Sequence, residues 1–176
     1  MNRTAAALAT VSYITAVVLA NVLTDRLGLV TAGFGLMVTA GTYAAGAALL
    51  ARDFVHRYAG IWFVLGCIAV AGVLSWLLAS PALAVASTVA FTAAELVDLA
   101  VFTPLRDRIG FAGSALISNV VSAPVDTVLF LTIAGFPLTW QAVTGQFVAK
   151  VLWATLLPLA VWVAVTVRSR RELAAA

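Results

Sequence analysis

Charge is scarce in this chain. Only 10% of its 176 residues are charged, while 64% are hydrophobic and the mean hydropathy is +1.11. A soluble domain carries roughly 25% charged residues, so too few are present here to cover a globule with a hydrated surface. The composition excludes an ordinary soluble protein and predicts one domain whose main solvent is lipid.

Cysteine and histidine are almost absent. The chain has one of each, Cys67 and His56. A disulfide framework needs paired cysteines, and a thiolate or histidine zinc site needs several ligands, so we expect no metal site and no cofactor. The GxxxxGK[ST] pattern of a P-loop is also missing, which indicates that the chain does not hydrolyse ATP itself.

Long apolar runs dominate instead. A helix needs ~20 mostly apolar residues to cross a bilayer, and a backbone in lipid must satisfy its own hydrogen bonds. Charges and Pro/Gly turns divide the chain into six predicted spans: 5–24, 32–51, 59–79, 82–105, 112–134 and 143–167. The expected fold is an all-α polytopic membrane protein, with a transmembrane domain over 5–167 and a cytoplasmic tail over 168–176.

The positions of the basic residues predict the orientation. With six spans, one side of the membrane receives Arg3, Arg52, Arg57, Arg106, Arg108 and the tail arginines. The other side receives only Arg26, next to Asp25. The positive-inside rule then places both termini in the cytoplasm, in the cell inner membrane. Because the basic residues sit at segment ends, they indicate topology and not a nucleic-acid partner. A cleaved signal peptide ending near Ala20 is the alternative, and it would spoil this asymmetry.

Ionisable side chains nevertheless occur inside the predicted spans, where each costs roughly 2.5–3.5 kcal/mol on insertion scales. Together with polar and aromatic neighbours they form three stripes at helical spacing. The stripes are Phe91, Glu95, Asp98 and Phe102; Asn119, Ser122, Asp126 and Phe130; and Gln146, Lys150 and Trp153. Since lipid does not solvate such stripes, we expect them to face one another across a cavity. The depths of Lys150 and Asp126 are compatible with a salt bridge.

Three of these carboxylates face one ammonium, which leaves two surplus negative charges. Either some carboxyls carry protons, or a ligand or cation supplies donors. The alternative is that these residues only join helices by hydrogen bonds. The segment Arg52-Asp53-Phe54-Val55-His56-Arg57 is interpreted as a cytoplasmic loop that sets topology and pairs helices. The glycines Gly33, Gly35, Gly41 and Gly46 are interpreted as close-packing positions of the second span.

Five short sequence stretches follow one another in an order that is typical of a known family. They are LANVL around Asn21, RDFVHRYAG, ASTVAFTAAELVDLAVFTPLR, ISNVVSAPVDTVLFLTIAG and QFVAKVL. In this series the chain resembles the VUT family of vitamin-uptake or queuosine-precursor transporters, although it reads VTAGTYAAG where that family often has Phe-Pro-Leu-Thr. The resemblance implies a six-helix transporter, similar to the substrate-binding subunits of energy-coupling-factor importers. It also implies uptake of a 7-deazaguanine such as 7-cyano-7-deazaguanine.

The residues agree with a flat, purine-like ligand. A carboxylate of Asp126 or Glu95 would accept the paired N–H donors of a guanine-like edge, and aromatic faces would stack on the ring. Amides would read ring nitrogens or the carbonyl. The predicted substrate-binding residues are Phe91, Glu95, Asp98, Asn119, Asp126, Phe130, Gln146, Lys150 and Trp153.

A proton- or gradient-linked carrier is open as the mode of transport, because surplus buried carboxylates can exchange protons. Two other functions also stay open. One is a vitamin-binding subunit of an energy-coupling-factor importer, which would need ATPase and scaffold partners. The other is a noncatalytic membrane scaffold. An intramembrane aspartyl protease would use Asp98 and Asp126, but the Gly-x-Gly-Asp setting of that chemistry is absent. We therefore expect a protein that is not an enzyme and has no catalytic residue.

Overall fold

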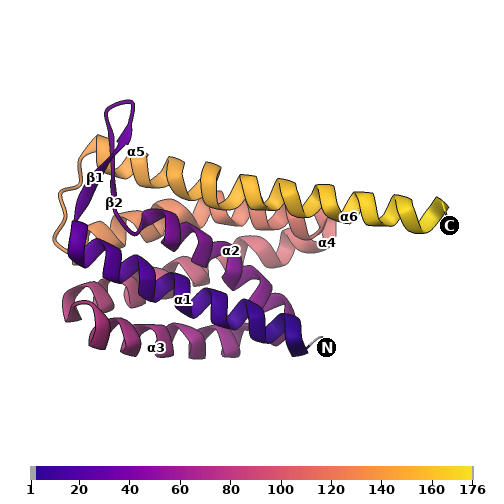
Figure 1. Ribbon diagram of the computed structural model, residues 1–176, viewed down its shortest axis with the longest axis horizontal. Helices are drawn as coiled ribbons and strands as arrows, with labels where there is room; N and C mark the ends of the chain where they lie inside the picture. The colour runs from indigo at the N-terminus through magenta and orange to yellow at the C-terminus, as the bar shows by residue number, and fades with distance from the viewer. Residues whose placement is uncertain (1–2, 176) are drawn as a thin grey trace.

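The structure is a bundle of long helices with one small β-hairpin. The computed structural model describes the backbone of residues 3–175 and the side chains of residues 4–168 other than 153, 154, 158 and 162. In chain order the elements are α1 (Arg3–Leu27), β1 (Leu29–Gly33), β2 (Leu36–Thr39), α2 (Thr42–Ala59), α3 (Ile61–Leu78), α4 (Pro81–Ile133), α5 (Trp140–Val148), the π-helical η1 (Ala149–Leu156) and α6 (Leu157–Ala175). The helices lie lengthwise beside one another, and both termini lie at the end opposite the hairpin (Figure 1).

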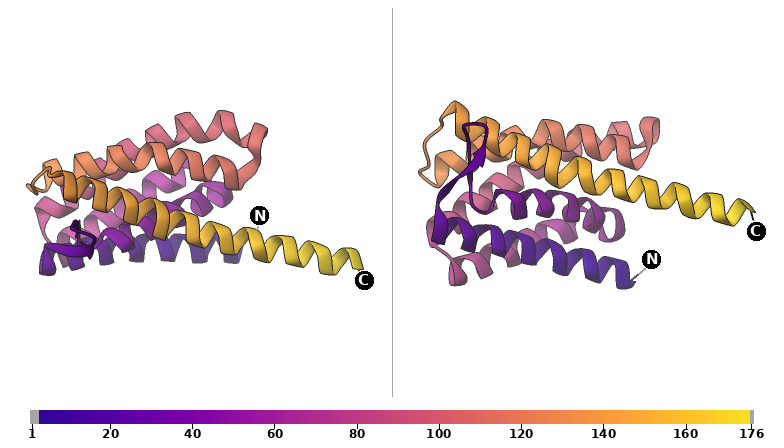
Figure 2. Two further views of the ribbon diagram at one scale, coloured as in Figure 1. Left: turned by 90° about the horizontal axis from the view of Figure 1, so that it is seen from above. Right: turned by 45° about the horizontal axis from the view of Figure 1, so that its top comes forward.

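The longest element, α4, is two helices joined at a sharp bend. A straight helix of 53 residues would extend about 80 Å, but Gly110 has φ 75° and ψ 177°, which is not helical. Glycine adopts such a conformation without a Cβ clash, and the chain doubles back there (Figure 2). We call residues 81–109 and 111–133 the first and second arms of α4. They contain most of the predicted spans 82–105 and 112–134.

Polar and apolar side chains are distributed the opposite way from a soluble protein. Large apolar side chains lie outside, with Trp62 84% and Leu77 72% exposed, while charged side chains such as Arg52 and Lys150 are buried. Among the residues that the structure describes, three helices are long and apolar enough to cross a membrane: Thr4–Leu27, Ile61–Leu78 and Pro81–Ile133. The protein is therefore a polytopic membrane protein, since only lipid tolerates such an exterior.

The first part of the second predicted span is not helical. Residues 29–39 form an antiparallel hairpin in which Leu29 pairs with Thr39 and Thr31 pairs with Met37. At its tip Gly33, Phe34 and Gly35 all have positive φ, a conformation that ends a helix and suits a tight turn. The all-α prediction was wrong at this point. Gly33 and Gly35 shape a turn and do not pack helices.

Because residues 29–39 form the hairpin, the next helix begins later in the chain than predicted. Because α2 starts only at Thr42, it continues to Ala59 and includes the segment 52–57. The prediction that this segment is a loop was wrong. The adjacent residues Arg52 and Asp53 are buried inside the bundle.

Two glycines allow the hairpin to lie against its neighbours. A Cβ on Gly145 of α5 would collide with the backbone carbonyl of Met37 in β2, and one on Gly41 would collide with the carbonyl of Ala20 in α1. The predicted close-packing role of Gly41 is confirmed. Val38, between these contacts, is fully buried, so the hairpin is packed onto one end of the bundle.

Replacing Gly145 with alanine should therefore separate the hairpin from α5. We expect the G145A variant to lose about 1–3 kcal/mol of unfolding free energy, the usual effect of overpacking. The control is G66A in α3, because a Cβ on Gly66 meets nothing within 4 Å and alanine favours helix. Titration from a mild detergent into SDS, followed by circular dichroism, measures both changes. Equal stability of the two variants would contradict the tight contact.

Candidate functional site

A buried ion pair joins the last two predicted spans. Lys150 Nζ lies 2.7 Å from Asp126 Oδ2 and donates a second hydrogen bond of 2.9 Å to Thr127 Oγ1. Lys150 belongs to η1, and the other two residues belong to the second arm of α4. Both charged side chains are at most 3% exposed. The predicted salt bridge between Lys150 and Asp126 is confirmed.

A small cavity lies beside this pair, at the end of the bundle that the hairpin covers. It is lined by Ala20, Asn21, Thr24, Thr39, Gly41, Thr42, Ala45, Ser87, Phe91, Asp126, Phe130, Gln146 and Lys150. These residues come from α1, β2, α2, both arms of α4, α5 and η1. About 20 Å³ is open to the centre of a water molecule, which is room for about one water. Eight of these thirteen residues carry polar or charged side chains.

Gln146 is the side chain whose hydrogen bonding is incomplete at this cavity. It is 1% exposed, and its Nε2 has no hydrogen-bond partner among the described residues. A buried donor without a partner costs about 1–3 kcal/mol. Such a donor on the wall of a cavity is typical of a group that meets a ligand.

Asn21 stabilises the part of the cavity wall that α1 forms. Its Nδ2 donates hydrogen bonds of 2.8 Å to Ser75 Oγ and to Ser87 Oγ. This amide thus joins α1 to α3 and to the first arm of α4. One turn later, Thr24 Oγ1 accepts a hydrogen bond of 3.2 Å from the backbone N–H of Gly41. This bond holds the segment between β2 and α2 against α1.

A second polar group, which we call the Arg52 cluster, lies nearer the end with the termini. It consists of Arg52, Asp53, Glu95, Asp98 and Asn119. The Arg52 guanidinium lies 2.7 Å from Asp53, 2.8 Å from Glu95 and 3.1 Å from Asp98. Asn119 bridges Arg52 and Asp53, with both bonds at 3.2 Å. One cation thereby connects α2 to both arms of α4.

Eight of the nine predicted binding residues divide between these two places. Phe91, Asp126, Phe130, Gln146 and Lys150 line the cavity. Glu95, Asp98 and Asn119 instead contact Arg52, so the prediction that all three stripes face one cavity was only partly right. The difference arises because a helical stripe longer than two turns extends beyond a small cavity.

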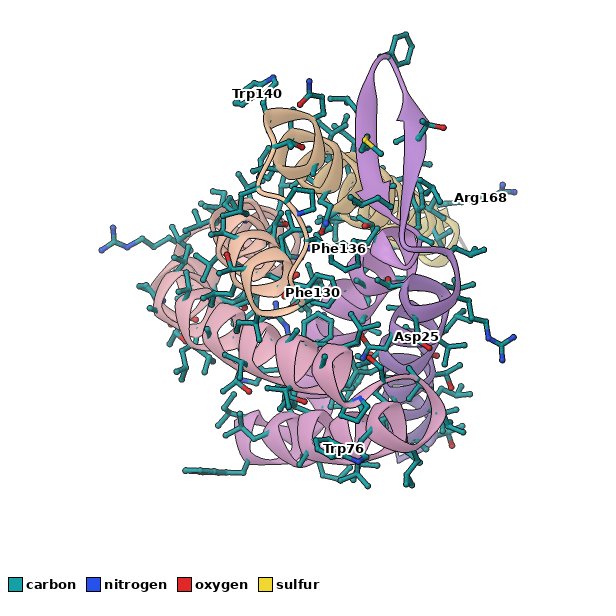
Figure 3. All side chains as sticks on the ribbon, turned by 90° about the vertical axis from the view of Figure 1, so that its left-hand side faces the viewer. Asp25, Trp76, Phe130, Phe136, Trp140 and Arg168 are labelled. Carbon is teal, nitrogen blue, oxygen red and sulfur yellow. The ribbon has the colours of Figure 1, made fainter. Side chains whose placement is uncertain are left out.

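The aromatic members of the stripes also separate. Phe130 lies beside Phe136, with ring centroids 6.4 Å apart, at the end of the bundle (Figure 3). Phe102 is not at the cavity and packs near His56 and Phe111, with centroids 6.1 and 6.0 Å apart. The side chain of Trp153 lies outside the described residues.

Several residues of the site were missing from the sequence prediction. Arg52 and Asp53 lay in an expected loop, and Thr39 lay in an expected helix. Asn21 and Ser87 were part of the resembling stretches but had no assigned role. Arg52 could have been predicted from Glu95 and Asp98, because buried carboxylates need a cation as a partner.

A family comparison agrees with this arrangement. The family model described as "Putative vitamin uptake transporter" matches residues 7–164, which include every residue of the cavity and of the Arg52 cluster. The chain belongs to this family. The comparison with curated proteins found no match, and neither did the comparison with solved structures.

In this vitamin-uptake family member, the helix that carries Lys150 is locally widened. Residues 149–156 are π-helical, and the N–H of Leu157 bonds to the carbonyl of Leu152, five residues earlier. Pro158 lacks an N–H and disfavours regular α-helix just before it. Wide turns of this kind occur frequently at functional sites, and here one begins next to Lys150.

Removing the arginine from the Arg52 cluster should destabilise the bundle strongly. In R52A three buried carboxylates lose their cation, so we expect a loss of about 3–5 kcal/mol of unfolding free energy. The matched control is R108A, because Arg108 is exposed and its removal should change stability by less than about 0.5 kcal/mol. SDS titration measures both. An R52A protein as stable as R108A would mean that the cluster does not hold α2 to α4.

Proposed function

We propose that this protein imports a flat, polar heterocycle, namely a 7-deazaguanine such as 7-cyano-7-deazaguanine, across the cell inner membrane. The observation that carries the proposal is the chemistry of the cavity wall. A carboxylate, an ammonium and two amides lie there together with two phenyl rings. Membership of a transporter family supports movement of the bound molecule across the membrane.

Each part of the wall suits one part of such a ligand. The carboxylate of Asp126 would accept the N–H donors of the guanine-like edge. The unpartnered Nε2 of Gln146 would donate to the ring carbonyl or a ring nitrogen. Phe91 and Phe130 would contact the flat faces, an interaction worth ~1–3 kcal/mol per base in nucleic-acid proteins.

The cavity is too small for a bicyclic ring, so binding requires movement of its walls. The hairpin and η1 are the elements best suited to move. The hairpin reaches the cavity through Thr39, and η1 is the widened helix that carries Lys150. A ligand that bound only the opened form would shift the population toward it.

Six membrane passes with both termini in the cytoplasm belong to the same proposal. The two arms of α4 would count as two passes, and α5, η1 and α6 together as one. An even number of passes agrees with the two termini lying at one end of the bundle (Figure 1). Arg57 lies in the last turn of α2, and Arg106 and Arg108 lie in the last turn of the first arm of α4. The positive-inside rule expects such residues on the cytoplasmic side.

A vitamin is the alternative cargo, because the family's description names vitamin uptake. The test uses cells that lack both their own precursor synthesis and their own precursor transporter. The measured quantity is queuosine in tRNA at low external 7-cyano-7-deazaguanine. We expect queuosine only when the protein is present, and no rescue would reject this substrate in favour of the alternative.

The cavity residue Gln146 provides a sharper test. Q146L keeps the side-chain size but removes the amide, so uptake of labelled 7-cyano-7-deazaguanine should fall at least about fivefold, the effect of one lost hydrogen bond. Q141L is the matched control, because Gln141 is an exposed glutamine of the same helix. Membrane quantities of both variants are compared by immunoblot. Equal uptake by the two would remove Gln146 from the site.

A further inference from the structure

The Arg52 cluster carries more negative charge than its own cation neutralises. Three carboxylates surround one guanidinium, which leaves a formal charge of −2 in a region that is almost completely shielded from solvent. A charge buried inside a lipid-embedded protein has a high energetic cost. Such charges therefore usually mark a functional site. The cavity residues do not compensate it, because Lys150 is already paired with Asp126.

One atom of this cluster is conspicuously without a donor. Glu95 is 0% exposed, and its Oε1 has no hydrogen-bond partner among the described residues. Its other oxygen lies 2.8 Å from Arg52 Nη1 but lacks hydrogen-bond alignment. An ionised carboxylate is expected to accept bonds at both oxygens. A proton on Glu95 would remove the charge that this environment leaves unsatisfied.

Polar groups lie between the cluster and the cavity. Along the second arm of α4, Asn119, Ser122 and Asp126 lie on one helical face and cover about 10 Å between the two places. The hydroxyl of Ser122 is buried without a hydrogen-bond partner among the described side chains. Tyr13 of α1 is buried and interacts electrostatically with both Glu95 and Asp126.

A titratable side chain also lies on the side of the cluster nearer the termini. His56 lies one turn beyond Arg52 on α2 and is half-buried. It interacts electrostatically with Arg52, Asp98 and Arg106. The charged or titratable groups that face Glu95 are thus Arg52 and Asp53 from α2, Asp98 from its own arm and Tyr13 from α1.

We propose that the Arg52 cluster is a proton-binding site centred on Glu95, and that its protonation couples uptake to the proton gradient. This inference rests on the proposed transport function. The proton enters from the outer side, converts the Glu95 carboxylate to a neutral carboxyl, and leaves toward the cytoplasm, which restores the carboxylate. No electron moves and no other bond changes.

A proton fits this site better than a metal ion does. The guanidinium of Arg52 occupies the space between the three carboxylates. Among the residues that the structure describes, no group of three or more His, Cys, Asp or Glu side chains is arranged to hold a metal ion. A proton needs only one free carboxylate oxygen, and Glu95 Oε1 supplies it.

The first test needs no substrate. Infrared spectra of the purified protein in liposomes are recorded as the pH is raised, and the carboxylic-acid C=O band is followed. We expect a band in the wild type that disappears with rising pH and is missing in E95Q. The control D107N removes an exposed carboxylate of the same arm and should keep the band. A band that is absent from the wild type, or identical in E95Q, overturns the proposal.

A second variant, D98N, keeps the proposal testable if E95Q does not fold. In D98N the band should remain, but it should disappear at a lower pH, because a neighbouring negative charge has been removed. Circular dichroism reports the fold of each variant. If D98N leaves the titration unchanged, the band does not belong to the Arg52 cluster.

The second test measures coupling. Liposomes containing the protein are given labelled 7-cyano-7-deazaguanine with and without an inward gradient of one pH unit. One proton per substrate supports about tenfold accumulation under this gradient, and E95Q should reduce the ratio to one. Wild-type uptake that ignores the gradient overturns coupling while transport stands. If the wild type takes up none at all, the proposed substrate fails, and the infrared titration still decides the proton site.

Discussion

The guanidinium of Arg52 holds the centre of this protein together. It lies between carboxylates of α2 and of the first arm of α4, and Asn119 connects it to the second arm. In lipid these groups have no alternative partner, so separating the helices would leave charges unsolvated. The positions of Glu95 and Asp98 within the bundle, and of every residue one or two turns away, follow from this one contact.

The cavity depends on that anchor because it uses the same helices. Phe91 precedes Glu95 by one turn on the first arm, and Asp126 follows Asn119 by two turns on the second. The Arg52 cluster therefore determines how far apart the cavity walls stand. The β-hairpin and the widened turn at Lys150 form the opposite end of the cavity.

Two polar places on shared helices also explain why so many charges are buried together. The pair Lys150–Asp126 is balanced and sits at the cavity, where a balanced pair can present a donor and an acceptor to a neutral ligand. The Arg52 cluster is unbalanced, with three carboxylates around one guanidinium. The proposed binding of a neutral heterocycle and the proposed binding of a proton therefore use different residues on the same helices.

Much of this architecture is readable from the sequence. Local composition and the regular rise of a helix predicted the membrane location, the approximate limits of α1, α3 and the two arms of α4, and the pairing of Lys150 with Asp126. The hairpin was not predicted from the sequence, because its residues are as apolar as those of a membrane-spanning helix. Its strand pairing and the positive φ angles at its tip are visible only in the structure. The role of Arg52 was decided by the tertiary structure alone. An arginine near the end of a span has the same local sequence pattern whether it contacts lipid headgroups or buried carboxylates. Only the packing of α2 against α4, which lies far away in the sequence, places Arg52 among three carboxylates.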